Sequence, residues 1–297
     1  LLSQRLNGNL YCIGMSLWKR AVIKPFFNLP GCKLHFVTSI KKLQQKTFKK
    51  NARLLIWSQG KEEVLNYAKA NNLPVLRMED GFIRSVGLGS NLVAPLSLVI
   101  DDLGIYFNSQ TPSRLEIILQ TQSFSEQDLQ LAKELKERLI HANIGKYNVG
   151  HSDFQIQAGN KKTILVPGQV EDDASIRFGS PLIKSNLELL KQVRSKNPTA
   201  YILYKPHPDV LSGNRIGAIA KAQALCYADE IVENVNILNC IQQVDEVHTI
   251  TSLAGFEALL RNKIVNCYGL PFYSNWGLTV DHIPLARRQR RLNLEQL

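Results

Sequence analysis

The sequence predicts an α/β fold built from two Rossmann-like domains that face a central cleft. First, 297 residues with 44% hydrophobic residues suffice for two cores, at ~100–200 residues per domain. Second, short apolar runs alternate with helix-forming runs, which is typical of parallel sheets with crossover helices. Third, the alternation occurs on both sides of a stretch at 144–159 that contains several Gly and Asn residues. We therefore expect an N-terminal domain at 1–155 and a C-terminal domain at 156–297, whose last residues can cross back.

In the first half, runs bounded by turn residues predict strands, and runs rich in Glu, Lys and Ala or with helical spacing predict helices. A small hairpin turning at Asp102 is expected to follow the strands. The expected strands lie at 10–14, 33–38, 54–57 and 74–78, the hairpin arms at 96–101 and 104–107, and the helices at 17–27, 61–70, 113–121 and 125–141.

The second half repeats the pattern and ends in an aromatic and glycine-rich loop at 269–277. Its clearest unit is a β-branched strand that runs directly into a helix with apolar residues at helical spacing. The expected strands lie at 163–166, 200–204, 246–250 and 264–268, and the helices at 181–194, 217–227, 236–243 and 253–261.

Composition narrows the function classes. No run approaches the ~18–20 apolar residues of a spanning helix, and no signal-peptide pattern opens the sequence, so we expect a cytoplasmic protein. The five cysteines are scattered, which argues for reduced thiols and against a zinc site, and we expect no metal and no cofactor. The net charge is +11 without an interleaved aromatic–basic patch, so nucleic acid is not an expected partner. Basic clusters at 41–50 and 287–291 are compatible with peripheral contact at an anionic inner membrane.

The strand–helix unit at 246–261 predicts an anion site. Thr251 or Ser252 can cap the helix, and a helix N-terminus offers free N–H donors and the positive end of the helix dipole. We expect Ser252 and the amides after it to hold a phosphate, although the same serine could serve only as a cap.

Further polar loops follow the strands of the second half. Ligands of open α/β sheets bind outside the carboxyl ends of the strands, so these loops should meet at one edge. Lys205 and His207 would supply positive charge and donors to a phosphate, and the Glu257 carboxylate could reach a ribose hydroxyl. Each residue alone could instead be structural, but their convergence favours a nucleotide site. The candidate donor-binding residues are Gln169, Lys205, His207, Ser252 and Glu257.

Two carboxylates are the candidate catalytic groups. Glu79 follows a strand of the first half and Asp173 a strand of the second, so they should face each other across the cleft. Two carboxylates that flank an anomeric carbon are the usual equipment of glycosyl chemistry. The acidic run 171–173 could alternatively bind a metal or cap a helix at Ser175, and metal binding is the weaker alternative because no further ligand cluster supports it.

Six longer motifs occur in order between about residues 54 and 281. They are Arg77–Ser85, Leu96–Asp101 with 104–106, Gln169–Ile176, Lys205–Val210, Thr251–Leu260 and Tyr268–Thr279. These motifs resemble the bacterial capsule polysaccharide Kdo transferases of the KpsC type.

The resemblance implies a GT-B glycosyltransferase that moves β-Kdo from CMP-Kdo, with retention, to a lipid-linked acceptor based on phosphatidylglycerol. It implies that Asp173 is the nucleophile and Glu79 the acid/base, and that His207 and Ser252 bind the CMP phosphate while Glu257 contacts the ribose. The implied partners are CMP-Kdo, an anionic glycolipid and capsule-export proteins. Related proteins often carry two such modules in tandem. Gly168, Gln169 and the two acids after Val170 look more like one of these module types than the other.

Two other functions remain open on the sequence. One is a sialyltransferase-like enzyme that uses a different CMP-activated acidic sugar. The other is a catalytically silent module that binds an anionic glycolipid, against which the two opposed carboxylates and His207 argue.

Overall fold

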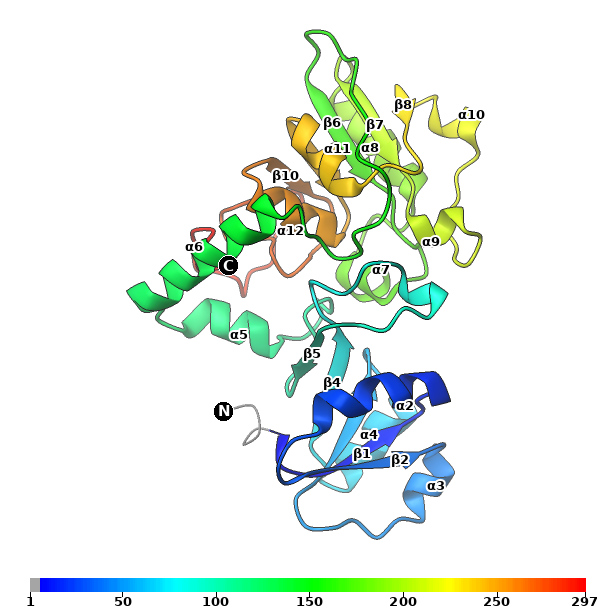
Figure 1. Ribbon diagram of the computed structural model, residues 1–297, viewed down its shortest axis with the longest axis vertical. Coiled ribbons are helices and arrows are strands. Elements are labelled where there is room, and N and C mark those ends of the chain that lie inside the picture. The colour runs from blue at the N-terminus through cyan, green and yellow to red at the C-terminus, as the bar shows by residue number, and fades with distance from the viewer. Residues whose placement is uncertain (1–5) are drawn as a thin grey trace.

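The computed structural model describes residues 6–297 and shows two lobes, each built around an α/β sheet (Figure 1). Residues 1–5, the start of the expected N-terminal domain, lie outside the described part. Within residues 6–297, no helix combines the length and the apolar content needed to cross a bilayer.

The first sheet has the order β2-β1-β3-β4-β5. Its first four strands are parallel, as predicted, and β5 is antiparallel to β4. The strands are β1 (Gly8–Ile13), β2 (Cys32–Val37), β3 (Ala52–Trp57), β4 (Val75–Asp80) and β5 (Leu98–Asp101). The helical segments of this half are α2 (Leu17–Ile23), η1 (Lys24–Phe27), α3 (Ile40–Gln44), α4 (Glu62–Ala70), η2 (Gly89–Asn91), α5 (Arg114–Thr121) and α6 (Glu126–His141).

The predicted hairpin of 96–101 with 104–107 is wrong. β5 pairs with β4, and residues 104–107 form no strand. The cause is Asp101, whose carboxylate accepts the N–H groups of Leu103, Gly104 and Arg114 at 2.8, 2.9 and 2.8 Å. This turn directs the chain away from the sheet and towards α5.

The second sheet has the order β11-β10-β9-β6-β7-β8 and is parallel throughout. Every residue of β6 is buried, as expected for a parallel sheet with both faces covered. The strands are β6 (Thr163–Pro167), β7 (Tyr201–Lys205), β8 (Glu230–Ile231), β9 (Glu246–Thr249), β10 (Ile264–Cys267) and β11 (Val280–Asp281). The helices are α7 (Ala174–Gly179), α8 (Asn186–Lys196), α9 (Pro208–Leu211), α10 (Lys221–Ala224), α11 (Ile237–Gln243) and α12 (Leu253–Leu260).

Local chemistry explains the shifted helix boundaries. The expected helix at 17–27 changes to a 3-10 turn around Pro25, which lacks the N–H that an α-helix requires. The expected helix at 181–194 starts later, because Ser185 and Glu188 form a capping box at the start of α8. The expected helix at 217–227 is reduced to α10.

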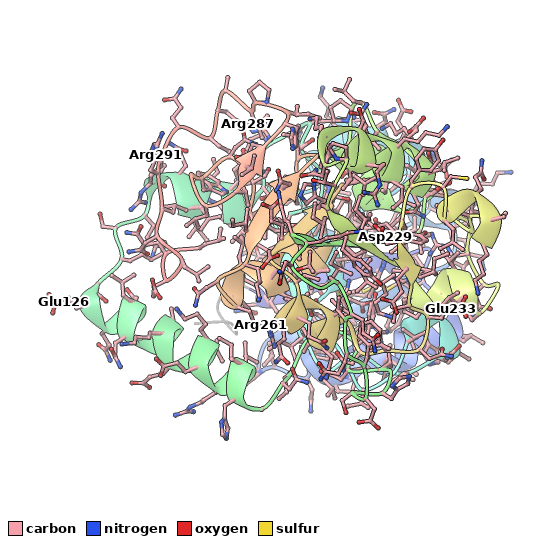
Figure 2. The ribbon with its side chains drawn as sticks, turned by 90° about the horizontal axis from the view of Figure 1, so that it is seen from above. Glu126, Asp229, Glu233, Arg261, Arg287 and Arg291 are labelled. Atoms are coloured by element: carbon pink, nitrogen blue, oxygen red, sulfur yellow. The ribbon has the colours of Figure 1, made fainter. Side chains whose placement is uncertain are left out.

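The C-terminal segment contacts helices that precede residue 155. Figure 1 shows α5 and α6 beside the second lobe, and Figure 2 shows Arg287 and Arg291 on the C-terminal segment after β11 (Val280–Asp281). Arg287 and Arg288 both form ion pairs with the buried Glu116 of α5, and Lys136 of α6 lies 2.6 Å from Glu295. These contacts tie the end of the chain to α5 and α6, while the division at residue 155 stays a prediction.

Candidate functional site

A cleft of about 1160 Å³ is lined by residues of both halves of the chain. The first half contributes the ends of β3 and β4 and residues 145–150, and the second half contributes the loops after β6, β7 and β9. All seven predicted site residues line this cleft, so the structure brings together positions that are far apart in the sequence: Glu79, Gln169, Asp173, Lys205, His207, Ser252 and Glu257.

Gln169 joins two of the strand-end loops. Its side chain is 6% exposed; Nε2 donates to Thr251 Oγ1 at 3.0 Å, and Oε1 accepts the Thr251 N–H at 2.9 Å. Both ends of the amide are therefore engaged with the β9–α12 loop. The geometry makes Gln169 a residue that positions the Ser252 loop.

We expect Gln169→Ala to lower the free energy of unfolding by about 1–3 kcal/mol, because the buried Thr251 groups lose their partner. Urea unfolding followed by circular dichroism measures this change. Gln44→Ala, on the exposed face of α3, is the matched control and should change stability by less than about 0.5 kcal/mol. Equal effects of the two substitutions would contradict the positioning role.

Ser252 caps α12, as predicted. Its Oγ accepts the Ala254 N–H at 3.2 Å, and its own N–H donates to Thr249 Oγ1 at 3.1 Å. The capped helix end points into the cleft wall, where its dipole favours an anion. The cap is thus in place, and the phosphate role of Ser252 stays a prediction.

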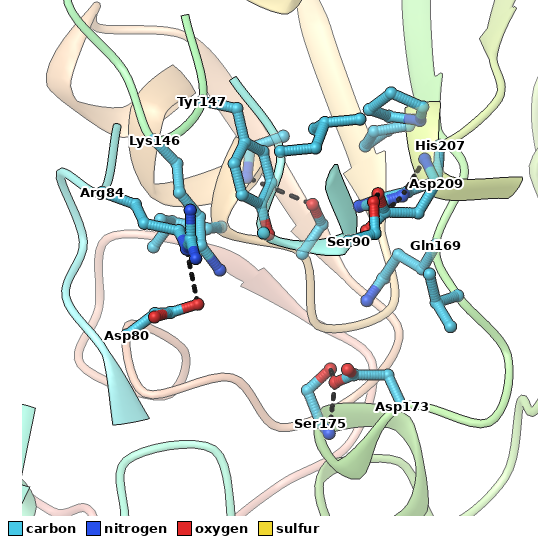
Figure 3. Close-up of a pocket in the computed structure, with 18 of the residues that line it drawn as sticks. Asp80, Arg84, Ser90, Lys146, Tyr147, Gln169, Asp173, Ser175, His207 and Asp209 are labelled. Atoms are coloured by element: carbon cyan, nitrogen blue, oxygen red, sulfur yellow. Dashed lines mark hydrogen bonds and ion pairs between the residues drawn. The ribbon is translucent and has the colours of Figure 1, made fainter. Parts of the chain in front are cut away.

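His207 caps the short helix α9 through its ring. Nδ1 accepts the Asp209 N–H at 3.1 Å, which places the ring proton on Nε2. Burial lowers the pKa of His207 to about 4, and the opposing influence of Asp209 does not reverse this shift. The imidazole is therefore neutral near pH 7 and offers one N–H donor, from Nε2. Figure 3 shows His207 in the pocket, and its ring centroid lies 6.2 Å from that of Tyr147.

Lys205 is more enclosed than the sequence suggested. It is 8% exposed, and its Nζ donates to the Glu233 carbonyl at 3.0 Å. Burial lowers the pKa of this ammonium group. The side chain lines the cleft but is held by the Glu233 carbonyl.

Glu257 is not a surface charge but an anchor for the segment between the lobes. It is 6% exposed, and its Oε1 accepts the Lys146 N–H at 2.8 Å. The Lys146 carbonyl in turn accepts the N–H groups of Arg84 and Ser85 at 3.0 and 3.1 Å. Burial raises the pKa of the Glu257 carboxyl. Residues 145–148 therefore connect α12 to the loop after β4.

The carboxylates of the first half lie within β4, which extends two residues further than expected. Burial, reinforced by the neighbouring Asp80 charge, raises the pKa of Glu79 to about 7. Asp80 Oδ2 accepts a hydrogen bond from Arg84 Nε at 2.6 Å, as Figure 3 shows. Glu79 can therefore exchange a proton near neutral pH, which suits an acid/base group.

Asp173 presents one oxygen to a helix and leaves the other for the cleft. Oδ1 accepts the N–H and the hydroxyl of Ser175 at 2.8 and 2.7 Å, so Asp173 caps α7 (Figure 3). No hydrogen bond from residues 6–297 engages Oδ2. Asp172 instead pairs with Arg215 at 3.0 Å.

Among residues 6–297, no three His, Cys, Asp or Glu side chains gather as metal ligands would.

Two further residues, Lys146 and Tyr147, also line the cleft, although no sequence motif indicated them. Lys146 Nζ is 5.1 Å from the Tyr147 ring centroid, and its pKa is raised because Tyr147, Tyr106 and Asp80 outweigh the effect of burial. The available signal was their position in the stretch at 144–159, where the sequence predicts a domain boundary, because a linker between two domains passes the cleft between them.

The sequence matches the family described as capsule polysaccharide biosynthesis protein at residues 58–152 and 127–296. Capsule polysaccharide modification protein LipA of Neisseria meningitidis serogroup B is 61% identical over 295 residues, covering 99% of this chain and 42% of LipA. Lipopolysaccharide-processing protein LpsZ of Rhizobium meliloti is 36% identical over 294 residues, covering 96% of this chain and 66% of LpsZ. The chain thus spans less than half the length of LipA.

Two solved structures of Thermosulfurimonas dismutans KpsC resemble this one. The beta Kdo 2,7 transferase has a TM-score of 0.79 and 42% identity, covering 97% of this chain and 88% of that chain. The beta Kdo 2,4 transferase has a TM-score of 0.80 and 27% identity, covering 96% and 88%. The predicted α/β, GT-B-like fold is confirmed. The family match and these similarities together establish that the chain belongs to the capsule polysaccharide biosynthesis protein family.

Proposed function

We propose that this protein is a retaining β-Kdo glycosyltransferase that uses CMP-Kdo and extends a lipid-linked acceptor of capsule biosynthesis. The observation that carries the proposal is one cleft that contains Asp173, Glu79 and the neutral His207. The KpsC structures, which are named as Kdo transferases, support the sugar class. We propose transfer of the 2,7 type, because identity is 42% to the 2,7 transferase and 27% to the 2,4 transferase.

The first step of the proposed reaction uses the second lobe. CMP lies against the loops after β7 and β9, where His207 Nε2–H and the α12 end stabilise the phosphate. Asp173 Oδ2 attacks the anomeric carbon, and the bond to the phosphate oxygen breaks with its electron pair leaving on CMP. A covalent Kdo–Asp173 ester results, with inverted configuration.

The second step uses Glu79. The acceptor hydroxyl attacks the same carbon from the opposite face, and Glu79 takes its proton as the ester to Asp173 breaks. The second inversion restores the original configuration, and Asp173 returns as a carboxylate. A pKa of about 7 lets Glu79 accept this proton at neutral pH and release it to water afterwards.

We expect CMP to raise the melting temperature by several degrees, and UDP and GDP at equal concentration to raise it far less. His207→Ala should reduce the rise in melting temperature caused by CMP, because the hydrogen-bond donor on Nε2 is lost. Differential scanning fluorimetry measures both. Equal melting-temperature shifts with all three nucleotides would refute a CMP-activated sugar as the donor.

Product formation identifies which sugar the protein transfers from the donor. Incubation with CMP-Kdo and an acceptor that ends in Kdo should give a product one Kdo heavier by mass spectrometry, and CMP-sialic acid should not replace the donor. Transfer from CMP-sialic acid would favour the sialyltransferase-like alternative, and CMP binding without any transfer would favour a silent module.

A further inference from the structure

Part of the cleft in the first lobe has no role in the mechanism above. It is lined by two tryptophans and one lysine, Trp18, Trp57 and Lys19, on the lobe that carries Glu79. We propose that these three side chains bind an acidic sugar of the acceptor and present its hydroxyl to Glu79. This inference rests on the proposed function, and it assigns the acceptor side of that site.

The sheet places these residues at one edge. β1 ends at Ile13 and α2 begins at Leu17, while β3, the neighbour of β1, ends at Trp57. β4 lies on the other side of β3 and carries Glu79. Ligands of α/β sheets bind beyond the carboxyl ends of the strands, and Figure 1 shows α2 on the side of the first lobe that faces the second.

Lys19 is held in place but has no counter-ion. Its N–H donates to the Ser16 Oγ cap at 3.2 Å, and its Nζ lies 3.9 Å from the Trp57 ring centroid. No carboxylate of residues 6–297 lies within ion-pair distance of this ammonium group. Burial lowers the pKa of Lys19, and the charges of Glu79 and Asp80 oppose this. A ligand carboxylate would therefore meet a partly desolvated cation fixed by an aromatic ring.

A sugar acid matches this set of groups. Its C–H face packs on indole rings, and its carboxylate pairs with an ammonium group. The CMP half of the donor would occupy the second lobe, near His207 and Ser252, so the first lobe is left for the acceptor. Lys19 and Glu79 line the same cleft at the same end of the first sheet, so a sugar bound at Lys19 would bring its hydroxyls towards the proton acceptor.

The test is steady-state kinetics of the whole chain with CMP-Kdo and a synthetic glycoside that ends in Kdo. Lys19→Met should raise the KM for this acceptor by about tenfold or more, the equivalent of one lost charge-assisted contact. The KM for CMP-Kdo and the CMP-induced melting shift should change less than twofold. Trp57→Leu should raise the acceptor KM in the same selective way, and Lys19→Arg should restore part of the loss.

Two comparisons sharpen the result. Lys24→Met removes the same charge from an exposed position outside the cleft and should leave both KM values unchanged. An acceptor whose carboxylate is converted to the primary amide should be a poor substrate for the unmodified protein. With this amide acceptor, the unmodified protein and Lys19→Met should have similar acceptor KM values.

An unchanged acceptor KM in Lys19→Met, or an equal rise in both KM values, would overturn the acceptor site while leaving Kdo transfer intact. Absence of any transfer by the unmodified protein would instead refute the proposed function. Loss of the CMP-induced melting shift in Lys19→Met would show that the substitution disturbs the fold or the donor site, and this would also count against the assignment.

Discussion

Asp173→Asn is expected to lower the rate of Kdo transfer by about 10⁴-fold or more, the scale of loss when a nucleophile is removed. The substitution keeps an oxygen that can accept from Ser175, so the cap of α7 and the local fold should persist. An amide oxygen cannot form the ester through which the proposed reaction passes. Product formation by mass spectrometry and CMP affinity by calorimetry measure the two effects separately.

Asp172→Asn is the matched control, because it makes the same change one residue earlier. Asp172 is half-exposed and pairs with Arg215, outside the proposed reaction path. We expect its transfer rate to stay within a few-fold of the unmodified protein. Normal turnover by Asp173→Asn would remove this residue as the nucleophile, and loss of CMP binding would show that it serves the donor site instead.

Glu79→Gln is expected to lower kcat by about 10²–10⁴-fold, the usual contribution of a general base. The amide cannot accept the acceptor proton, whereas the size of the side chain is unchanged. If the first step stays intact, the Kdo–Asp173 ester should accumulate in this variant, and intact-protein mass spectrometry would detect the added mass. Glu63→Gln, on the exposed side of α4, should have no such effect.

The pH dependence follows from the same carboxyl group. The pKa of Glu79 is raised to about 7 by burial, so the group is protonated and inactive as a base below this pH. The rate should fall about tenfold per pH unit below 7 and level off above it. This decrease of the rate below pH 7 should be absent from Glu79→Gln. A rate in the unmodified protein that is flat between pH 5 and 8 would argue against Glu79 as the base.

Local sequence patterns predicted the fold class and most of the elements, and they nominated seven residues that the structure brings into one cleft. Apolar runs and helical spacing are local, so the parallel strands and the cap at Ser252 could be predicted from neighbouring residues. The strand-end rule then placed Asp173 and His207 beside Ser252, and the cleft contains all three.

The role of each side chain in the cleft depends on contacts between distant segments of the chain. The amide of Gln169 is engaged by Thr251, and the carboxylate of Glu257 by the Lys146 N–H, partners that are 82 and 111 residues away in the chain. Burial sets the pKa of Glu79 and the neutral state of His207. These properties depend on the groups that pack around a side chain, and packing between distant segments leaves no periodic pattern in the sequence.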